Sequence, residues 1–299
     1  MKKLACLLCQ LLCLSACGED LPSGALLERP RVLGVRVEVE GEPQRAAPRA
    51  GETFELRWLL AAPEPVEWSA ALVLCGAAPN QTGVPSCAGA PFATLATDAP
   101  TATPTFTARV PDPAPEQIVL IGTLTAEAHE PETVLFVFPV AAQDDPPNQH
   151  PTLGDERITI DDRPWNVPET PPPSTGCASA PDTDAFPHVA ARDEESPSLV
   201  ELSIAPEDRE PYREIVFGEG PTVVDAREEI TVSHIASGGR LARLQSIVFD
   251  DDASRVRVEW QHPSSDTLPN DGLTVSFIFV ARDGRGGMDW VERSLCVTP

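Results

Sequence analysis

Lysine is almost absent from this 299-residue chain, because its two lysines are Lys2 and Lys3. The chain has 22 basic residues in all, so the other 20 are arginines, and they face 46 acidic residues. Beyond residue 3 there is therefore no phosphate-loop lysine, no Schiff-base lysine and no serine–lysine nucleophile pair. The acidic excess would also repel the phosphates of nucleic acids. We expect none of these lysine chemistries and no nucleic-acid partner.

A long hydrophobic run is also missing. The apolar stretch Leu4–Leu14, interrupted by Gln10, is about half as long as the ~20 residues that a membrane-spanning helix needs. Two lysines precede this stretch, and the small residues Ser15 and Ala16 follow it. A positive start, a short apolar segment and a small-residue cleavage site are typical of a secretory signal peptide. The sequence therefore predicts that residues 1–16 are removed and that the rest is exported.

The end of this segment, Leu14-Ser15-Ala16-Cys17, resembles the bacterial lipobox. The resemblance implies that the Cys17 thiol carries diacylglycerol and that cleavage falls between Ala16 and Cys17. A membrane partner, reached through this lipid, is then expected. Gly18, rather than aspartate, follows Cys17, which favours the outer membrane over the inner one. The alternative is a plain signal peptide that happens to end in cysteine, in a region with three other cysteines: Cys6, Cys9 and Cys13.

Four more cysteines remain in the exported part: Cys75, Cys87, Cys177 and Cys296. An even number in an oxidising compartment predicts disulfides. Three pairings are possible, and we favour Cys75–Cys87 with Cys177–Cys296, because each pair then lies within one predicted domain. No two of the four show the C-x₂₋₄-C spacing of a zinc site, so we expect neither metal nor other cofactor.

Apolar and polar residues alternate along most of the exported part, as in Val35, Val37 and Val39 and again in Phe54, Leu56 and Trp58. This period of two is typical of half-buried strands, and no segment shows a helical period. We expect an all-β protein with two tandem immunoglobulin-like β-sandwich domains. The predicted boundaries are a flexible tether at 17–28, a first domain at 29–141, a linker at 142–151 and a second domain at 152–299. A proline-rich, irregular insertion is predicted near 164–197, with Trp165 partly exposed.

Two short segments resemble immunoglobulin-like lipoproteins of high-GC diderm bacteria. Ala50-Gly51-Glu52-Thr53 resembles the Pro-Gly-Glu-Thr type of segment that precedes a strand in these proteins. The segment 280–287, Val-Ala-Arg-Asp-Gly-Arg-Gly-Gly, resembles the last hairpin of polycystic-kidney-disease-like or cadherin-like modules. The resemblance implies a sandwich fold outside the cytoplasm, and it provides no catalytic residue.

Candidate ligand-binding and catalytic motifs are few. Asp250, Asp251 and Asp252 offer oxygen ligands for calcium, but a charged turn between two strands is the favoured interpretation. His129-Glu130 is followed by Pro131, which excludes a helical zinc-protease motif. Gly218-Glu219-Gly220 lacks the third glycine of a dinucleotide loop, so a hairpin turn is predicted there.

These observations favour a non-catalytic binding or structural module, anchored in the cell envelope by its lipid, with an envelope protein or a glycan as partner. Two alternatives remain. An envelope hydrolase acting on peptide or glycan could use two of the many carboxylates. A calcium-dependent adhesion protein would use Asp250–Asp252.

Overall fold

A computed structural model describes residues 24–79, 83–144, 146, 148–153, 157–173, 176–193, 195–204, 206, 209–218, 220–249 and 254–299. Within these ranges the secondary structure consists of strands and short 3₁₀ turns, without an α-helix, so the all-β prediction is confirmed. Over the same ranges, no helix has the length and apolar character needed to cross a membrane. The signal segment, the lipobox residues Leu14, Ser15, Ala16 and Cys17, and the calcium candidates Asp250–Asp252 all lie outside the described residues.

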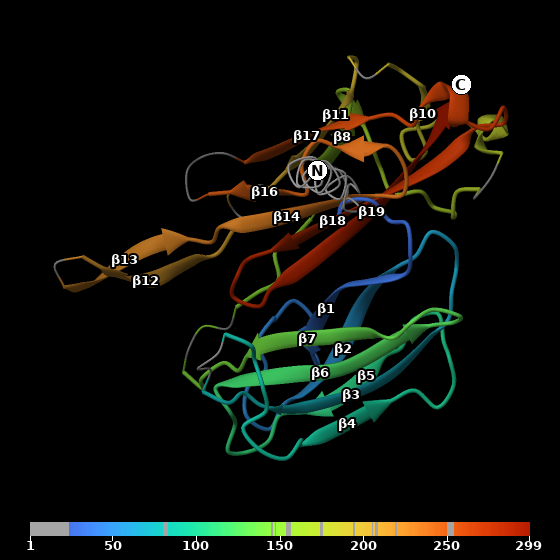
Figure 1. The fold of residues 1–299 in the computed structure, drawn as a ribbon. Helices are drawn as coiled ribbons and strands as arrows, with labels where there is room; N and C mark the ends of the chain where they lie inside the picture. The colour runs from blue at the N-terminus through green and yellow to red at the C-terminus, as the bar shows by residue number, and fades with distance from the viewer. Residues whose placement is uncertain are drawn as a thin grey trace, which may run out of the picture.

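The first half of the chain forms two antiparallel sheets that face each other (Figure 1). Alternate side chains of the long strands point into the space between them, as Phe54, Leu56 and Trp58 do on β2. Val37 pairs with Leu56 across β1 and β2, so apolar residues of both strands share this inner face. One sheet has the order β1-β2-β5 and the other β4-β3-β6-β7. Their bounds are β1 Arg31–Val39, β2 Thr53–Ala61, β3 Trp68–Gly76, β4 Ala93–Ala96, β5 Phe106–Arg109, β6 Gln117–Ala126 and β7 Glu132–Pro139.

The second half forms another pair of sheets around a separate apolar core. Their orders are β15-β17-β11-β8-β9 and β10-β19-β18-β14-β16. All pairings are antiparallel except that between β10 and β19. The bounds are β8 Ile158–Ile160, β9 Arg163–Pro164, β10 His188–Ala190, β11 Ser198–Ser203, β14 Ile230–Ala236, β15 Arg240–Leu241, β16 Gln245–Val248, β17 Arg255–Gln261, β18 Leu273–Arg282 and β19 Met288–Thr298, with 3₁₀ turns at Cys177–Ser179 and Ser265–Thr267.

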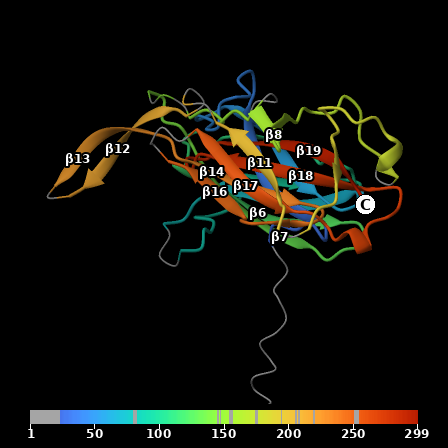
Figure 2. The same ribbon diagram turned by 90° about the horizontal axis from the view of Figure 1, so that it is seen from above.

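One hairpin lies outside both pairs of sheets. Strands β12 (Pro211–Phe217) and β13 (Pro221–Arg227) pair with each other and with no other described strand. Figures 1 and 2 show this hairpin standing away from the rest of the second half. The hairpin turn was predicted at residues 218–220; Gly218 and Gly220 lie between the two strands and the Gly218 N–H donates to Gly220 O at 3.3 Å, while Glu219 lies outside the described residues. We call the hairpin, Pro211–Arg227, the arm.

Both disulfides have the favoured pairing. Cys75 is bonded to Cys87 and Cys177 to Cys296, with Cα atoms 5.5 and 5.7 Å apart. The second bond fixes the proline-rich insertion to the last strand, and the insertion also supplies β10 beside β19. The insertion is therefore more ordered than the proline content suggested.

The prediction that Trp165 is partly exposed was wrong. Its side chain is fully buried, and its ring lies edge-to-face on Phe277 with centroids 5.0 Å apart. The indole Nε1 donates to Ser294 O at 3.0 Å, and Arg293 Nε donates to Trp165 O at 2.7 Å. The insertion carries this tryptophan over the sheet, where the indole closes the apolar core.

The predicted flexible tether at 17–28 also needs correction at its end. Ala25 and Leu27 are buried, and residue 27 donates its backbone N–H to Ala236 O at 2.8 Å. Ala236 returns a 2.8 Å bond to Ala25 O. This segment therefore pairs with the end of β14. Ala25 packs in the core of the second half, and Leu27 packs in a separate apolar cluster with Ile235 of β14.

Candidate functional site: the junction and the arm

The two halves meet through a third apolar cluster. Leu59 and Ala61 of β2 face Ile278 and Val280 of β18, and Met288 of β19 completes the contact. All five side chains are buried. On β18 the other face carries Phe277 and Phe279 into the core of the second half. Successive residues of one strand thus serve two different cores.

Charged residues frame this cluster. Arg36 Nη1 of β1 lies 2.9 Å from Asp289 Oδ1 of β19, and Arg282 Nη2 donates to Leu33 O at 2.6 Å. The Arg57 guanidinium lies over the Trp290 ring at 5.3 Å. Burial raises the pKa of the Asp289 carboxyl, and the neighbouring Arg36 opposes that rise. Each of these pairs joins one half of the molecule to the other.

His150, in the predicted linker, joins both halves through its ring. Met288 N–H donates to Nδ1 at 3.0 Å, so Nε2 carries the proton and donates to Val37 O at 2.7 Å. Burial lowers the pKa of His150 to about 4. The ring is therefore neutral at neutral pH, as both hydrogen bonds require.

A buried acidic cluster lies at the root of the arm. Asp283 accepts hydrogen bonds from Asn148 Nδ2 at 2.7 Å and from the N–H groups of Arg285 and Gly287 at 2.7 and 2.8 Å. Glu228, also buried, follows β13. Burial, helped by the charge of Asp283, raises the pKa of Glu228 to about 7.

Arg285 provides the positive charge for this cluster. Its Nη1 lies 3.0 Å from Glu228 Oε1 and its Nη2 lies 3.6 Å from Glu210 Oε2. The same guanidinium lies over the Tyr212 ring of the arm at 5.1 Å. Among the described residues, no group of three or more His, Cys, Asp or Glu is arranged so that it could hold a metal ion. The cluster instead ties the arm to the turn between β18 and β19.

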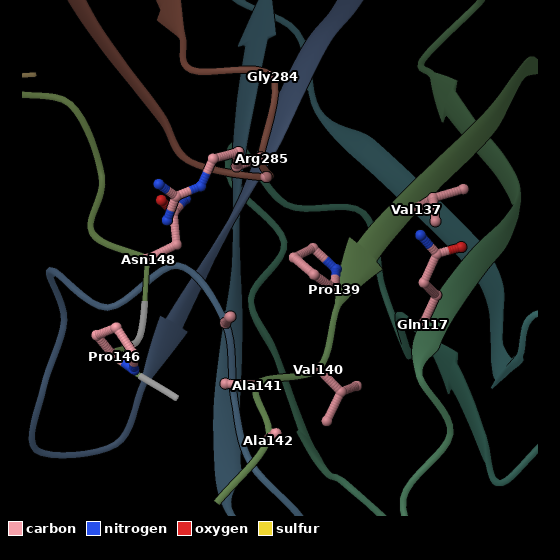
Figure 3. Close-up of a pocket in the computed structure, with 12 residues that line it drawn as sticks. Gln117, Val137, Pro139, Val140, Ala141, Ala142, Pro146, Asn148, Gly284 and Arg285 are labelled. Carbon is pink, nitrogen blue, oxygen red and sulfur yellow. The ribbon is translucent and has the colours of Figure 1, made fainter. Parts of the chain in front are cut away.

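A hollow of about 520 Å³ opens beside this turn (Figure 3). Gln117, Val137 and Pro139 of the first half line one side, and Asn148 and Arg285 lie together on the other. Its described lining residues include no carboxylate, so they do not supply the facing pair of carboxylates that a glycoside hydrolase uses.

One serine, one histidine and one aspartate do come together in the second half. The Ser198 hydroxyl donates to Asp161 Oδ2 at 2.9 Å, and His262 Nε2 lies 2.8 Å from the same hydroxyl. Because the serine proton points to the carboxylate, the hydroxyl accepts from Nε2–H and the histidine is not positioned as its base. Ser198 is also fully buried. The arrangement fixes β11 to β17 and does not present a nucleophile.

The arm is the main feature that the sequence did not reveal. Phe217 at its tip is 80% exposed, and four other apolar side chains are between 37% and 59% exposed: Ile215, Val216, Val223 and Val224. A hairpin turn was predicted at residues 218–220, but strand β13 and the exposed position of the hairpin were not. The signal was the pair of runs Ile215-Val216-Phe217 and Val223-Val224, which lack the alternation of a half-buried strand.

Comparison with known proteins identifies no family: no family model matches the chain, and no curated protein matches it. Among solved structures, the chain is similar to a transglutaminase from red sea bream, with 10% sequence identity and a TM-score of 0.26. The similarity covers 93% of this chain and 34% of that one, so this chain spans about a third of its length. A TM-score this low supports no inference about fold or activity.

Proposed function

We propose that this chain is a lipid-anchored, extracytoplasmic binding module without catalytic activity, built from two tandem immunoglobulin-like sandwiches. The observation that carries the proposal is the exposed apolar arm on a body whose two halves share a buried junction. Contiguous exposed apolar surface marks interaction sites in soluble proteins. A firmly joined body presents such a site in one fixed orientation.

The strand orders support the immunoglobulin-like part of the proposal. The first half has β1-β2-β5 facing β4-β3-β6-β7. The second half repeats this order as β8-β11-β17 facing β16-β14-β18-β19. Both match a seven-strand immunoglobulin-like arrangement in which the fourth strand has moved to the second sheet. By this correspondence the arm replaces the loop between the second and third strands, and binding residues commonly lie on such loops.

Lipidation is tested by growing cells with a fatty acid that carries an alkyne tag. The intact chain should take up the label and fractionate with the envelope membranes, the outer membrane in particular. Cys17→Ala should lose the label. Cys13→Ala is the matched control, since a cysteine inside the discarded signal should leave labelling unchanged. Equal labelling of wild type and Cys17→Ala would exclude the anchor.

Binding through the arm is tested in the native envelope with a photo-cross-linking phenylalanine analogue at position 217. We expect a covalent adduct with a protein or a glycan. Val84, 62% exposed in the first half, provides the control position and should give none. The same weak labelling at both positions would contradict an arm-based binding function.

A further inference from the structure

The register of the arm gives it one strongly apolar face. Ile215 lies opposite Val223, and Phe217 lies opposite Pro221, so these four side chains share a face. All four are exposed. Toward the root, Arg213 and Asp225 continue this face as an exposed ion pair. The outer part of this face is therefore apolar, and its charged residues lie toward the base.

The arm also has two open strand edges. Among the described strands β12 pairs only with β13, so the outer side of each strand has no neighbouring strand. A two-stranded hairpin alone is marginally stable in water. Hydrocarbon cannot satisfy open backbone groups, and open sheet edges do not occur in the lipid-exposed core of a bilayer. These edges favour a protein partner with its own strand edge over a lipid surface.

The same chain carries a strand edge of this kind. Strand β16 is the last strand of its sheet and pairs only with β14 among the described strands. Three apolar side chains along and beside β16 are 49–51% exposed: Leu244, Ile247 and Phe249. We call this surface, residues 244–249, the β16 edge. It offers what the arm lacks, namely backbone partners next to exposed apolar side chains.

Charge does not oppose contact between two copies here. The arm contains two arginines and three acidic residues and the β16 edge contains no charged residue, so together they have a formal charge of −1, whereas the whole chain carries −24; Asp250, Asp251 and Asp252 follow the β16 edge directly in the sequence. The arm and the β16 edge therefore form a nearly neutral region on a strongly acidic molecule.

We propose that the partner of the arm is a second copy of this chain, in a symmetric dimer where each arm adds to the β16 edge of the other copy. The arm root lies next to the β16 edge of its own copy, because Arg209 Nη1 donates to Phe249 O. When the arm of the first copy reaches the β16 edge of the second copy, the arm of the second copy therefore lies near the β16 edge of the first. The dimer then contains two identical contacts and is closed. The proposal rests on the binding function above and names its partner.

Sedimentation velocity of the purified full chain, in detergent and across micromolar concentrations, tests the dimer. The wild type should dimerise, and Phe217→Asp or Phe249→Asp should each weaken the dimer at least tenfold. Val84→Asp is the control and should leave it unchanged. The substituted side chains are exposed, so at concentrations where the wild type is monomeric the variants should melt at the same temperature as the wild type. Ile215→Asp and Ile247→Asp form a second pair of variants for the same comparison.

Mixing the two variants gives the decisive result. A heterodimer of Phe217→Asp with Phe249→Asp keeps one contact in which both the arm and the β16 edge are wild type. We therefore expect dimers to reappear on mixing. A monomeric wild type, a Phe249→Asp chain that dimerises normally, or a mixture that stays monomeric would each overturn the proposal. A cross-link from position 217 to a different macromolecule would overturn it too, while leaving the binding function intact.

Discussion

Single buried polar residues determine how the two halves of this protein are joined. His150 is the clearest case, because its ring accepts from Met288 of one half and donates to Val37 of the other. Both bonds require the neutral ring, and burial already lowers the pKa of His150 to about 4. Protonation would remove the acceptor at Nδ1 and leave a charge in the junction.

We predict that His150 makes the junction sensitive to acid. The unfolded ring takes up a proton below a pKa of about 6.5 and the folded ring only below about 4, so stability falls as pH falls between these values. The linkage amounts to about 2.5 kcal/mol of unfolding free energy at pH 4.5. The destabilisation caused by His150→Gln should therefore be smaller at pH 4.5 than at pH 7.5 by about this amount.

Urea unfolding of wild type and variant at both pH values measures this difference. The comparison removes other titrating groups, such as Glu228, whose raised pKa acts in the opposite direction. His129 is exposed, so His129→Gln is the control. Its free energy of unfolding should stay close to that of the wild type at both pH values. An equal cost of His150→Gln at pH 4.5 and 7.5 would refute the role assigned to the ring.

Individual strands show what the sequence can predict. Alternation at Val35, Val37 and Val39 and at Phe54, Leu56 and Trp58 correctly predicted the strands β1 and β2, because one face of each is buried in a core. Strand β13 was missed, since both of its faces are largely exposed and no burial pattern marks it. Trp165 was misplaced for the opposite reason: its neighbours are polar or proline, and only the tertiary fold brings the indole over Phe277. The favoured disulfides could be chosen because each closes within one group of strands.

The candidate site could not be predicted from the sequence for a related reason. Glu228, Asp283 and Arg285 come from two separate turns, and nothing in their spacing indicates that they meet. The lipobox prediction rests on a local signal at Leu14–Cys17, and it stays a prediction because those residues lie outside the described ones. Pairing between a strand edge and a distant partner depends on which edges remain open, and this is known only once the sheets are assembled.

At Gly122 of β6, the backbone of the neighbouring strand β3 leaves no room for a side chain. A Cβ atom at this position would lie 2.2 Å from Ala71 O and 2.7 Å from the Leu72 Cα of β3. Neither atom belongs to a flexible side chain, so β3 and β6 would have to separate. We predict that Gly122→Ala lowers the free energy of unfolding by about 3 kcal/mol or more. Gly89→Ala, where a Cβ meets nothing within 4 Å, is the control for chemical denaturation, and an equal effect at both sites would contradict this account.

At the scale of the whole molecule, the apolar junction should make the two halves unfold together. Two units joined only by a linker unfold separately, whereas a buried apolar contact couples them. Each fully buried aliphatic side chain contributes roughly 1.5–3 kcal/mol, and Leu59, Ile278, Val280 and Met288 are all buried in the cluster between the halves. Neither half can therefore unfold without exposing apolar surface of the other.

We predict a single calorimetric transition for the wild type and two transitions for Leu59→Asp. The aspartate would place a charge among the apolar side chains of the junction, and separation of the halves is the easiest way to hydrate it. Leu135→Asp is the matched control, because Leu135 on β7 is 38% exposed and lies outside the junction; its thermogram should keep one transition.

The contact between the two halves should also affect binding through the arm. Arg285, which contacts the arm at Tyr212, lies in the turn that reaches the linker through Asn148 and Asp283, so Leu59→Asp should also weaken the dimer measured by sedimentation. Two transitions in the wild type, or one unchanged transition in Leu59→Asp, would show that the halves unfold independently of this cluster.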